Sequence, residues 1–309
     1  MTAQRIVSLL PSATEILCLL GLEDRIVGIT HECDYPSSII SRPTVTQTVI
    51  PHHATSREID TLVRERLVTT KALYSLDLDL LETLQPDLLV TQALCDVCAV
   101  SEEEVNAAAC SLSSQPRVVN LEPSTLNEVF DCILAIGNAT GLEGVANKKV
   151  AELRARVDAV RQRSASIARP ARVTLLEWIA PLFCCGHWSP ELIRYAGGLE
   201  SLGREHAPST TISPDDLIAA QPEVLILALC GYSVEQAMHD FPLLEAIPGF
   251  RDLPCYRNRR IYALDGSAYF SRPGPRLVDS LEILAHTLFP DVHPRVSELP
   301  LAVNVLENR

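Results

Sequence analysis

The sequence predicts an α/β fold of two lobes, each built on a mostly parallel sheet and joined by one long, rigid helix. Short apolar runs typical of buried strands alternate with helical patterns along nearly the whole chain. The longest uninterrupted helical pattern lies near the middle, and the order of elements before it recurs after it. We therefore expect a first lobe at residues 1–142, a connecting helix at 143–169 and a second lobe, with a tail, at 170–309.

The connecting helix is predicted from Val145 to Ile167, because apolar or small residues recur there in alternating steps of four and three. At about 1.5 Å per residue, this segment would span roughly 34 Å. The expected apolar stripe comprises Ala146, Val150, Leu153, Val157, Val160 and Ile167. The opposite face, which we interpret as solvated, carries Lys148, Lys149, Arg154, Arg156, Arg161 and Arg163.

The first half of the chain is expected to alternate strands and helices. Ser12 and Glu15 have the spacing of a capping box, which predicts a helix that opens there and runs to about Leu20. Strands are predicted at Arg5–Leu10, Arg25–Thr30, Leu73–Leu76, Leu88–Thr91 and Arg117–Leu121. Further helices are predicted at Ser56–Thr69, Asp79–Leu84, Glu102–Ala109 and Leu126–Thr140.

The second half repeats this order, with a strand at Val173–Glu177 and a helix at Pro190–Ala196. Two tripeptides mark the repeat most clearly. Gln85-Pro86-Asp87 precedes an apolar strand in the first half, and Gln221-Pro222-Glu223 precedes one in the second. The pattern indicates two lobes of the same architecture.

Composition excludes several classes of protein. The formal net charge of −13 argues against nucleic-acid binding, and no apolar run reaches the ~18 residues of a membrane span. Ten cysteines in so long a chain are more simply interpreted as reduced thiols than as a disulfide scaffold. The N-terminus has no basic leader, and Pro11 interrupts its apolar run. We therefore expect a cytoplasmic location for the chain as it begins here, and a periplasmic or membrane-associated one if its start is misassigned.

The loops after the carboxyl ends of the predicted strands are the expected ligand-binding loops, because ligands of open parallel sheets bind there. They span residues 31–35, 92–98, 178–188, 230–232 and 265–276. Aromatic residues make up only 5% of the chain, yet the last three of these loops contain Trp178, Trp188, Tyr232, Tyr269 and Phe270. A flat, largely apolar ligand would explain them, and the alternative is that they cover the ends of the sheets.

At these loops the chain resembles the substrate-binding proteins of iron-siderophore and cobalamin ABC importers, and most of all their cobalamin-binding branch. The resemblance implies two Rossmann-like lobes joined by one helix, and capture of a ligand in the cleft between them without chemistry. It rests on RIVSLLPSATEI at 5–16, GITHECDYP at 28–36, QPDLLVTQALCDVCAV at 85–100, LEWIAPLFCCGHW at 176–188 and DGSAYFSRPGPRLVDSLEILA at 265–285.

The resemblance further implies a corrinoid ligand, cobalamin or a relative, with haem or a siderophore as the alternative. The family places an acidic residue just before its second-lobe aromatic segment, and Ala268 stands there in this chain. A permease would be contacted through Glu103 and through Asp215 or its neighbour Asp216, with the protein itself a monomer. The residues that we expect to bind the ligand are Tyr35, Gln92, Cys95, Asp96, Trp178, His187, Trp188, Tyr232, Tyr269, Phe270 and Arg272.

Cysteine and histidine side chains in the same loops raise the question of a metal. Cys95 and Cys98 form a CxxC pair that could bind zinc, exchange disulfides or be structural. With Cys185 and His187 they could form a sulfur and nitrogen site for zinc, copper or iron. Alternatively, His187 could contact the cobalt of a corrinoid. No G-x-S-x-G, P-loop or HExxH motif is present, so we expect no enzyme.

Overall fold

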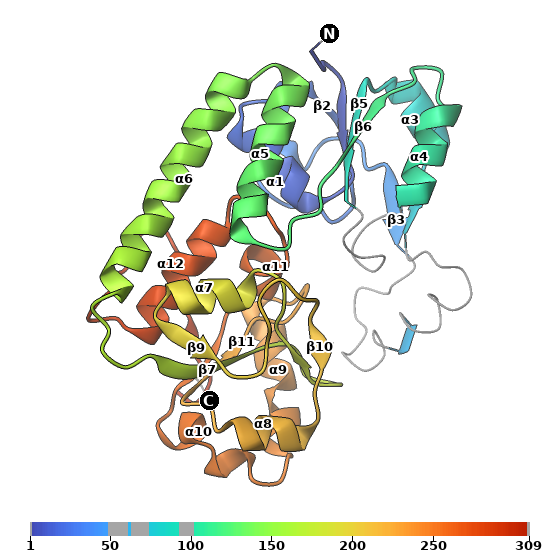
Figure 1. Ribbon diagram of the computed structural model, residues 1–309. Coiled ribbons are helices and arrows are strands. Elements are labelled where there is room, and N and C mark those ends of the chain that lie inside the picture. The colour runs from blue at the N-terminus through green and yellow to red at the C-terminus, as the bar shows by residue number, and fades with distance from the viewer. Residues whose placement is uncertain (1, 49–60, 63–73, 93–101, 308–309) are drawn as a thin grey trace. The chain divides into compact units, whose positions relative to one another are not determined.

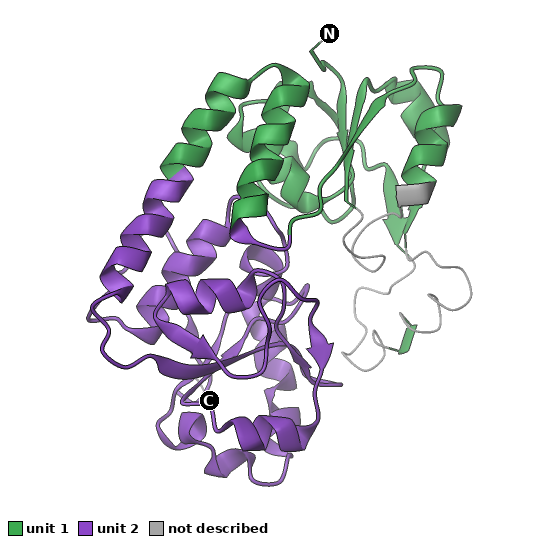
Figure 2. Cartoon of the chain, in the orientation of Figure 1, with its two compact units in different colours: residues 1–123, 127–152 green, residues 124–126, 153–309 purple. Residues whose placement is uncertain are grey.

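The computed structural model describes residues 2–48, 61–62, 74–92 and 102–307 (Figure 1). The chain forms two compact units (Figure 2). Unit 1 comprises residues 1–123 and 127–152, and unit 2 comprises residues 124–126 and 153–309. Each unit holds a sheet with helices packed against it, which confirms the α/β class.

Unit 1 is built on a four-stranded parallel sheet in the order β2-β1-β5-β6. Its strands are β1 (Ile6–Ser8), β2 (Ile26–Ile29), β5 (Leu88–Thr91) and β6 (Arg117–Asn120). Two short strands, β3 (Thr46–Thr48) and β4 (Tyr74–Leu76), form a separate antiparallel pair. The helices are α1 (Pro11–Leu19), α3 (Leu78–Leu84), α4 (Glu102–Ser111), α5 (Leu126–Thr140) and the start of α6 (Glu143–Ser164). Single 3-10 turns lie at Glu23–Arg25 and Ser37–Ile39.

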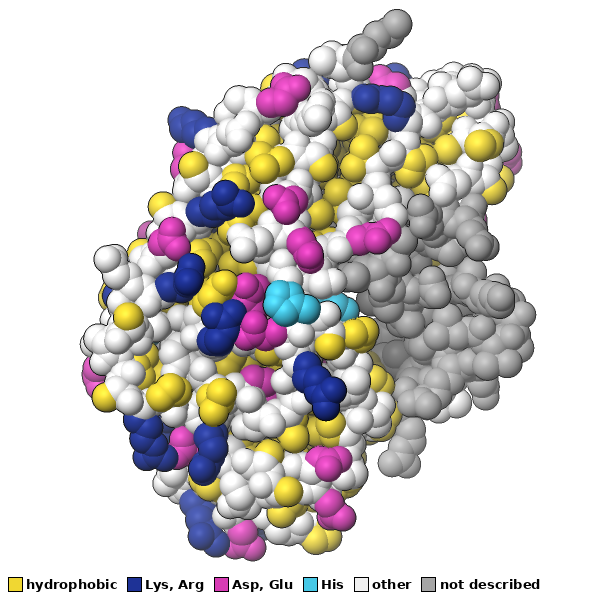
Figure 3. Space-filling model, viewed as in Figure 1, with side chains coloured by type: hydrophobic (Ala, Val, Ile, Leu, Met, Phe, Trp, Pro, Cys, Tyr) yellow, Lys and Arg dark blue, Asp and Glu magenta, His cyan; other side chains and the backbone are white. Residues whose placement is uncertain are grey.

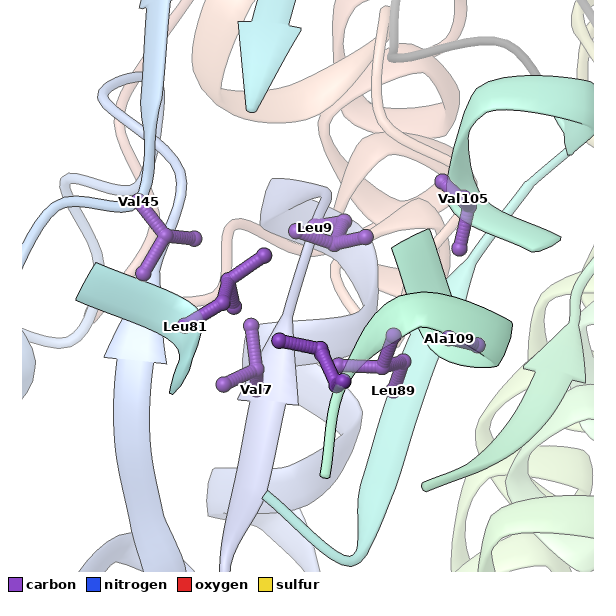
Figure 4. Close-up of a cluster of buried hydrophobic side chains, with 8 residues drawn as sticks. Val7, Leu9, Val45, Leu81, Leu89, Val105 and Ala109 are labelled. Atoms are coloured by element: carbon purple, nitrogen blue, oxygen red, sulfur yellow. The ribbon is translucent and has the colours of Figure 1, made fainter. Parts of the chain in front are cut away.

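Helices α3 and α4 cover one face of this sheet, and α1 and α5 cover the other (Figure 1). On the first face, alternate residues of the strands meet the apolar residues of the two helices in one buried cluster (Figure 4). The cluster comprises Val7, Leu9, Val45, Leu81, Leu89, Val105, Ala109 and Leu112. This packing fixes the carboxyl ends of β1 and β5, where the predicted loops begin.

Unit 2 is built on a larger sheet in the order β10-β8-β7-β11-β12-β13, with β9 paired to β7. Strands β7, β9, β11 and β12 are parallel, whereas β8, β10 and β13 add antiparallel pairs. The strands are β7 (Ala171–Trp178), β8 (Phe183–Cys184), β9 (Gly198–Glu200), β10 (Thr210–Thr211), β11 (Val224–Leu227), β12 (Ile261–Ala263) and β13 (Val303–Asn304).

Helices cover both faces of the unit 2 sheet, with α7 and α12 packed together on one side (Figure 1). Two of these helices begin with complete capping boxes, formed by Ser213 with Asp216 and by Ser233 with Gln236. The helices are α7 (Ser189–Tyr195), α8 (Pro214–Ala220), α9 (Val234–Glu245), α10 (Pro254–Arg257), α11 (Gly266–Tyr269) and α12 (Leu277–Leu288), with a 3-10 turn at Phe250–Asp252.

The predicted internal repeat is present in atomic detail. The order β2-β1-β5-β6 in unit 1 corresponds to β9-β7-β11-β12 in unit 2. Gln85 and Gln221 both end a helix in the left-handed region, each with φ of 46°. The carboxylate of Asp87 accepts the backbone N–H of Arg5, and that of Glu223 accepts the backbone N–H of Arg172. Each tripeptide therefore pins the start of one strand to the start of its neighbour.

Helix α6 runs from Glu143 to Ser164. It therefore begins two residues earlier and ends three residues earlier than the predicted span of Val145–Ile167. The chain passes from unit 1 to unit 2 inside this helix, between Glu152 and Leu153. The predicted apolar stripe is buried from Ala146 to Val160, while Ile167 lies beyond the helix. Gly144 lies in the first turn of the helix, and the helix ends at Ser164, before Pro170.

The basic face of α6 is not uniformly solvated, contrary to the sequence-based interpretation. Basic side chains are spread over the surface on this side of the molecule (Figure 3). Arg156, however, bonds with both oxygens of Glu282 and with Asp279, all on helix α12. Arg161 stacks its guanidinium on the ring of Tyr195 at 4.8 Å. These residues attach the second half of α6 to unit 2.

The predicted capping box at Ser12 and Glu15 is wrong. Helix α1 begins at Pro11, and its N-cap is Leu10, which has no side-chain hydrogen bond to offer. Proline favours the first helical position because its missing N–H would be unpaired there, so the helix begins one residue before the predicted cap. Ser12 and Glu15 are consequently buried inside the helix.

The other sequence-based elements have mixed outcomes. The helix predicted at Ser56–Thr69 lies outside the described residues except for positions 61–62. The strand predicted at Leu73–Leu76 is β4, and the helix predicted at Pro190–Ala196 is α7, shifted by one residue. None of the helices in the described parts of the chain has the length and apolar character of a membrane span.

Candidate functional site

Five aromatic residues lie at the carboxyl ends of three parallel strands of unit 2, and we call them the aromatic cluster. Trp178 ends β7, and its ring lies 5.1 Å from that of Tyr232, which follows β11. The indole Nε1 of Trp188 donates a 2.9 Å hydrogen bond to the carbonyl oxygen of Phe270, which follows β12. The cluster comprises Trp178, Trp188, Tyr232, Tyr269 and Phe270.

Only part of the aromatic cluster presents surface to solvent. Trp188, Tyr232 and Phe270 are buried, with 6%, 7% and 3% of their surface exposed. Trp178 and Tyr269 are half-buried. The first three rings are therefore packed in the interior, whereas the last two have surface that a ligand could contact.

Close backbone contacts hold these loops together. The backbone N–H of Ser267 donates to the carbonyl of Tyr232 at 3.2 Å, which joins the loop after β12 to the loop after β11. Gly266 lies so close to the second loop that a Cβ atom there would stand 2.0 Å from the carbonyl oxygen of Leu229. Only glycine fits at this position without displacing backbone.

His187 lies between β8 and α7 and has a constrained backbone. Its φ is 51°, in the left-handed region, and its N–H donates to the carbonyl of Ala207 at 2.6 Å. The N–H of His206 in turn donates to the carbonyl of His187. Burial lowers the pKa of the His187 imidazole, which keeps the ring neutral near pH 7. A neutral imidazole beside Trp188 is chemically suited to ligate a metal.

Glu177 is a residue of this region that the sequence-based reasoning missed. It lies one residue before Trp178 on β7, and its carboxylate accepts hydrogen bonds from the hydroxyl of Ser209 and from the backbone of Gly186. Burial raises the pKa of this carboxyl to about 7, and nearby Glu200 adds to the shift. An acidic residue near the end of an otherwise apolar strand was the signal available in the sequence.

The two arginines of the last loop have different surroundings. Arg272 is buried, and its guanidinium donates a 3.4 Å hydrogen bond to the hydroxyl of Ser267. Arg276 lies over the ring of Tyr269, with its guanidinium carbon 5.5 Å from the ring centroid. Arg276 thus supports the aromatic cluster through a cation–π contact.

In unit 1, two of the expected ligand-binding residues are described. Tyr35 is 49% exposed, whereas Gln92, at the end of β5, is buried. The amide oxygen Oε1 of Gln92 has no hydrogen-bond partner among the described residues. Asp96 and Cys95 lie outside the described residues.

His31 has a structural role in its own loop. Its Nδ1 lies 2.7 Å from the hydroxyl of Thr46, and its ring lies 5.2 Å from that of Tyr74. His31 therefore orders the loop that carries Tyr35.

The residues predicted to bind zinc are not brought together in the part of the chain that can be described. Cys95 and Cys98 lie outside it. Cys185 is a buried thiol hydrogen-bonded to Glu200, and its burial, together with the nearby Glu200 charge, raises the pKa of the thiol. No group of three or more histidine, cysteine or acidic side chains in the described ranges is arranged to hold a metal ion. The eight cysteines in these ranges form no disulfides.

The predicted permease contacts fall on two helices. Glu103 lies in α4, and its side chain is outside the described part. Asp215 is exposed in the first turn of α8. Its neighbour Asp216 accepts hydrogen bonds from Ser213, and these lower the pKa of Asp216. Of the two aspartates, only Asp216 is occupied in capping its helix.

Comparison with known proteins identifies the family. The chain matches the periplasmic binding protein family over residues 6–268. It is 24% identical over 282 residues to the vitamin B12-binding protein of Vibrio cholerae serotype O1, a match that covers 91% of this chain and 87% of that protein. It is 21% identical over 299 residues to an uncharacterized ABC transporter substrate-binding lipoprotein of Bacillus subtilis, covering 93% and 81%.

A solved structure agrees with this assignment. A periplasmic haem-binding protein from Pseudomonas aeruginosa has the same fold, with a TM-score of 0.74 at 20% identity, covering 97% of this chain and 98% of that one. The chain belongs to the periplasmic binding protein family, as the sequence motifs predicted. It is a solute-binding protein and not an enzyme, and the family implies a small-molecule ligand and an ABC permease partner.

The expected cytoplasmic location is wrong. The family is that of periplasmic binding proteins, and one of the relatives is a lipoprotein, so the relevant location is outside the cytoplasmic membrane. The expectation rested on the cysteine content and on the first residues alone. Both are weaker guides than a match along nearly the whole chain.

Proposed function

We propose that this protein captures a corrinoid, cobalamin or a relative of it, and delivers it to an ABC permease. The observation that carries the proposal is the aromatic cluster, in which loops from three neighbouring strands meet through the Trp188–Phe270 bond and the Trp178–Tyr232 contact. A flat, largely apolar macrocycle buries well against such rings. The similarity to a vitamin B12-binding protein over 91% of the chain supports the corrinoid class.

We propose that the ligand contacts exposed aromatic rings and nearby polar side chains of the predicted loops. Trp178 and Tyr269 of unit 2 and Tyr35 of unit 1 offer aromatic faces, and buried Arg272 and Gln92 offer polar groups to the amides of a corrinoid. Replacement of Trp178 or Tyr35 by alanine should weaken binding by about tenfold or more, because a lost aromatic contact costs on the order of 1–2 kcal/mol. Leu199→Ala is the matched control, since Leu199 is apolar and 59% exposed on β9.

The ligand class is tested by competition. Purified protein is mixed with cyanocobalamin, hydroxocobalamin, haemin or a ferric siderophore, and each mixture is run on gel filtration with detection of the visible bands. We expect the cobalamins to comigrate with the protein at micromolar concentration and haemin to displace them poorly. Comigration of haemin or the siderophore, with neither cobalamin retained, would assign the site to the alternative ligand class.

We also propose that His187 contacts the metal at the centre of the ligand. Its imidazole is neutral and half-buried, and its backbone is fixed on both sides. His187→Ala should shift the visible spectrum of bound hydroxocobalamin, whereas His206→Ala should not. His206 is a good control because it is the neighbouring histidine with positive φ and is exposed. An unchanged spectrum in His187→Ala would remove this role and leave the corrinoid assignment intact.

Delivery of the ligand to the permease is tested by replacing the exposed Asp215. We propose that Asp215 on α8 and Glu103 on α4 contact the permease, as the resemblance implies. Asp215→Ala should leave ligand affinity unchanged and reduce ligand-dependent uptake in cells that express the cognate permease. Asp216→Ala is the matched variant, since it should lower helix stability by loss of the capping box but retain uptake. Uptake reduced equally by both variants would refute a specific role for Asp215.

A further inference from the structure

Glu177 joins four segments of unit 2 that are separate in sequence. Its Oε2 accepts a 2.5 Å hydrogen bond from the hydroxyl of Ser209, in the segment that leads to β10. Its Oε1 receives the N–H of Gly186 at 3.4 Å and the hydroxyl of Ser189 at 3.5 Å, on either side of His187 and Trp188. Its own carbonyl oxygen accepts the N–H of Cys230 at 2.9 Å.

These partners are the segments that carry the aromatic cluster. Gly186 and Ser189 bracket the turn that bears His187 and Trp188, and Cys230 lies two residues before Tyr232. Trp178 follows Glu177 directly and contacts Tyr232. The carboxylate of Glu177 therefore joins the turn that bears His187 and Trp188 to the segment at Ser209, and its backbone carbonyl joins the loop after β11.

The fold itself does not require a carboxylate at this position. The internal repeat provides the comparison, because Ile6 pairs with Leu88 in unit 1 as Val173 pairs with Val224 in unit 2. Counting along the two strands from these pairs, the position of Glu177 corresponds to Leu10, which is buried and apolar. The same strand end is thus built in unit 1 without a buried acid.

The backbone of the turn around Gly186 lies directly against the backbone of residues 207–209. A Cβ atom at Gly186 would stand 2.4 Å from the carbonyl oxygen of Ala207 and 2.4 Å from the amide nitrogen of Ser209. The turn bearing His187 and the segment at residues 207–209 therefore lie backbone against backbone. Glu177 bonds to both sides of this contact.

We propose that Glu177 is the positioning residue of the unit 2 half of the ligand site, acting through its hydrogen bonds to Ser209 and to the turn that bears His187 and Trp188. This inference rests on the proposed function. Glu177 does not touch the ligand, and its carboxylate holds the turn that bears His187 and Trp188 in place. Replacement of Glu177 should lower ligand affinity more than a replacement elsewhere that lowers the melting temperature equally.

Three variants test the inference. Glu177→Ala removes all of the side-chain bonds and should weaken cobalamin affinity by about tenfold or more. Glu177→Gln keeps one carbonyl oxygen for Gly186 and Ser189 and offers an NH₂ group to the Ser209 oxygen, so it should bind within about threefold of the unchanged protein. Ser209→Ala removes one bond only and should fall between the two, which provides a variant that folds if Glu177→Ala does not.

Glu223→Ala is the matched control, because Glu223 is a partly buried acid that pins the opposite end of β7 through Arg172. It should lower the melting temperature and leave affinity within about threefold. The inference is overturned if Glu177→Ala binds as well as the unchanged protein. It is equally overturned if Glu177→Ala and Glu223→Ala lose affinity in proportion to their losses in melting temperature.

A readout without ligand separates this inference from the proposed function. The chain has two tryptophans, Trp178 and Trp188, and both lie in the loops that Glu177 joins. Acrylamide quenching of tryptophan fluorescence should increase in Glu177→Ala, with Glu177→Gln and Glu223→Ala resembling the unchanged protein. If no tested ligand binds but quenching follows this order, the proposed function fails and the positioning role stands. Unchanged quenching in Glu177→Ala refutes the positioning role.

Discussion

The indole nitrogen of Trp188 donates its proton to the carbonyl oxygen of Phe270 across 82 positions of sequence, at a distance of 2.9 Å. The bond joins the turn before α7 to the segment between α11 and α12, and both partners are buried. A buried carbonyl that loses its donor carries a free-energy penalty, so this contact holds the two loops at a fixed separation.

Trp188→Phe should test this bond, since it retains an aromatic ring but removes the indole N–H together with part of the indole ring. We expect a loss of about 1–3 kcal/mol in the free energy of unfolding, because the Phe270 carbonyl is left unpaired. Trp178→Phe is the control, because the Trp178 N–H bonds only to Ala180, two residues away in a partly exposed turn. Urea denaturation of both variants provides the measurement, and equal losses would contradict the assignment.

The parts of the fold that depend on local pattern could be predicted from the sequence. The stripe from Ala146 to Val160 was visible because helical periodicity is a property of neighbouring residues. The repeat was visible because Gln85 and Gln221 occupy equivalent helix ends before equivalent strands. The short antiparallel strands β8, β10 and β13 were missed, since two residues such as Phe183 and Cys184 carry no periodicity.

The places of several predicted site residues in the fold could be expected from the sequence, and their packing could not. Parallel strands place their carboxyl ends together, so Trp178 and Tyr232 could be expected to meet. Which rings face outward depends on packing with distant segments, and for that reason the burial of Trp188 and Phe270 was not foreseen. The role of Glu177 was equally hidden, because its partner Ser209 lies 32 positions away.

Helix α6 provides a second prediction, centred on Arg156. Arg156→Met removes the guanidinium that pairs with Asp279 and Glu282 and leaves two partly buried acids side by side. We expect a loss of about 1–3 kcal/mol in the free energy of unfolding. The pairing could not be read from the sequence, since these acids lie 123 and 126 positions away.

Arg154→Met is the control for this change, because Arg154 is exposed two residues earlier in the same helix. Its replacement should alter the free energy of unfolding by no more than about 0.5 kcal/mol. Guanidinium denaturation of the two variants compares them directly. A similar small effect in both would mean that the Arg156 contacts contribute nothing beyond a surface ion pair.

Two glycines of very different surroundings provide the third prediction. Gly186→Ala would place a Cβ atom 2.4 Å from backbone atoms of Ala207 and Ser209, so the turn that bears His187 must shift. Gly144→Ala, in the first turn of α6, meets nothing within 4 Å. We expect Gly186→Ala to lose about 2 kcal/mol or more, and Gly144→Ala to gain up to about 1 kcal/mol from higher helix propensity. Thermal unfolding by circular dichroism distinguishes the two, and a stable Gly186→Ala would show that the turn can move freely.

His293 provides a pH dependence with a definite sign. It is 1% exposed, lies 3.1 Å from the hydroxyl of Ser164 at the end of α6, and has Arg163 beside its other ring nitrogen. Burial, with the Arg163 charge adding to the effect, lowers the pKa of the His293 imidazole from 6.5 to about 4. In the folded protein the ring is therefore neutral at pH 5, whereas in the unfolded chain it is protonated.

Because the unfolded chain binds this proton first, the contribution of His293 to stability is complete above about pH 7 and is lost as the pH falls toward 4. The pH dependence that Glu177 contributes has the opposite sign, because its pKa is raised to about 7. A variant of His293 is therefore needed to separate the two contributions to stability. His293→Gln cannot titrate. The stability difference between the unchanged protein and this variant should be smaller at pH 5 than at pH 7.5 by on the order of 1 kcal/mol. Urea denaturation at the two pH values measures it, and a difference that is the same at both would show that His293 is protonated equally in the folded and unfolded chains.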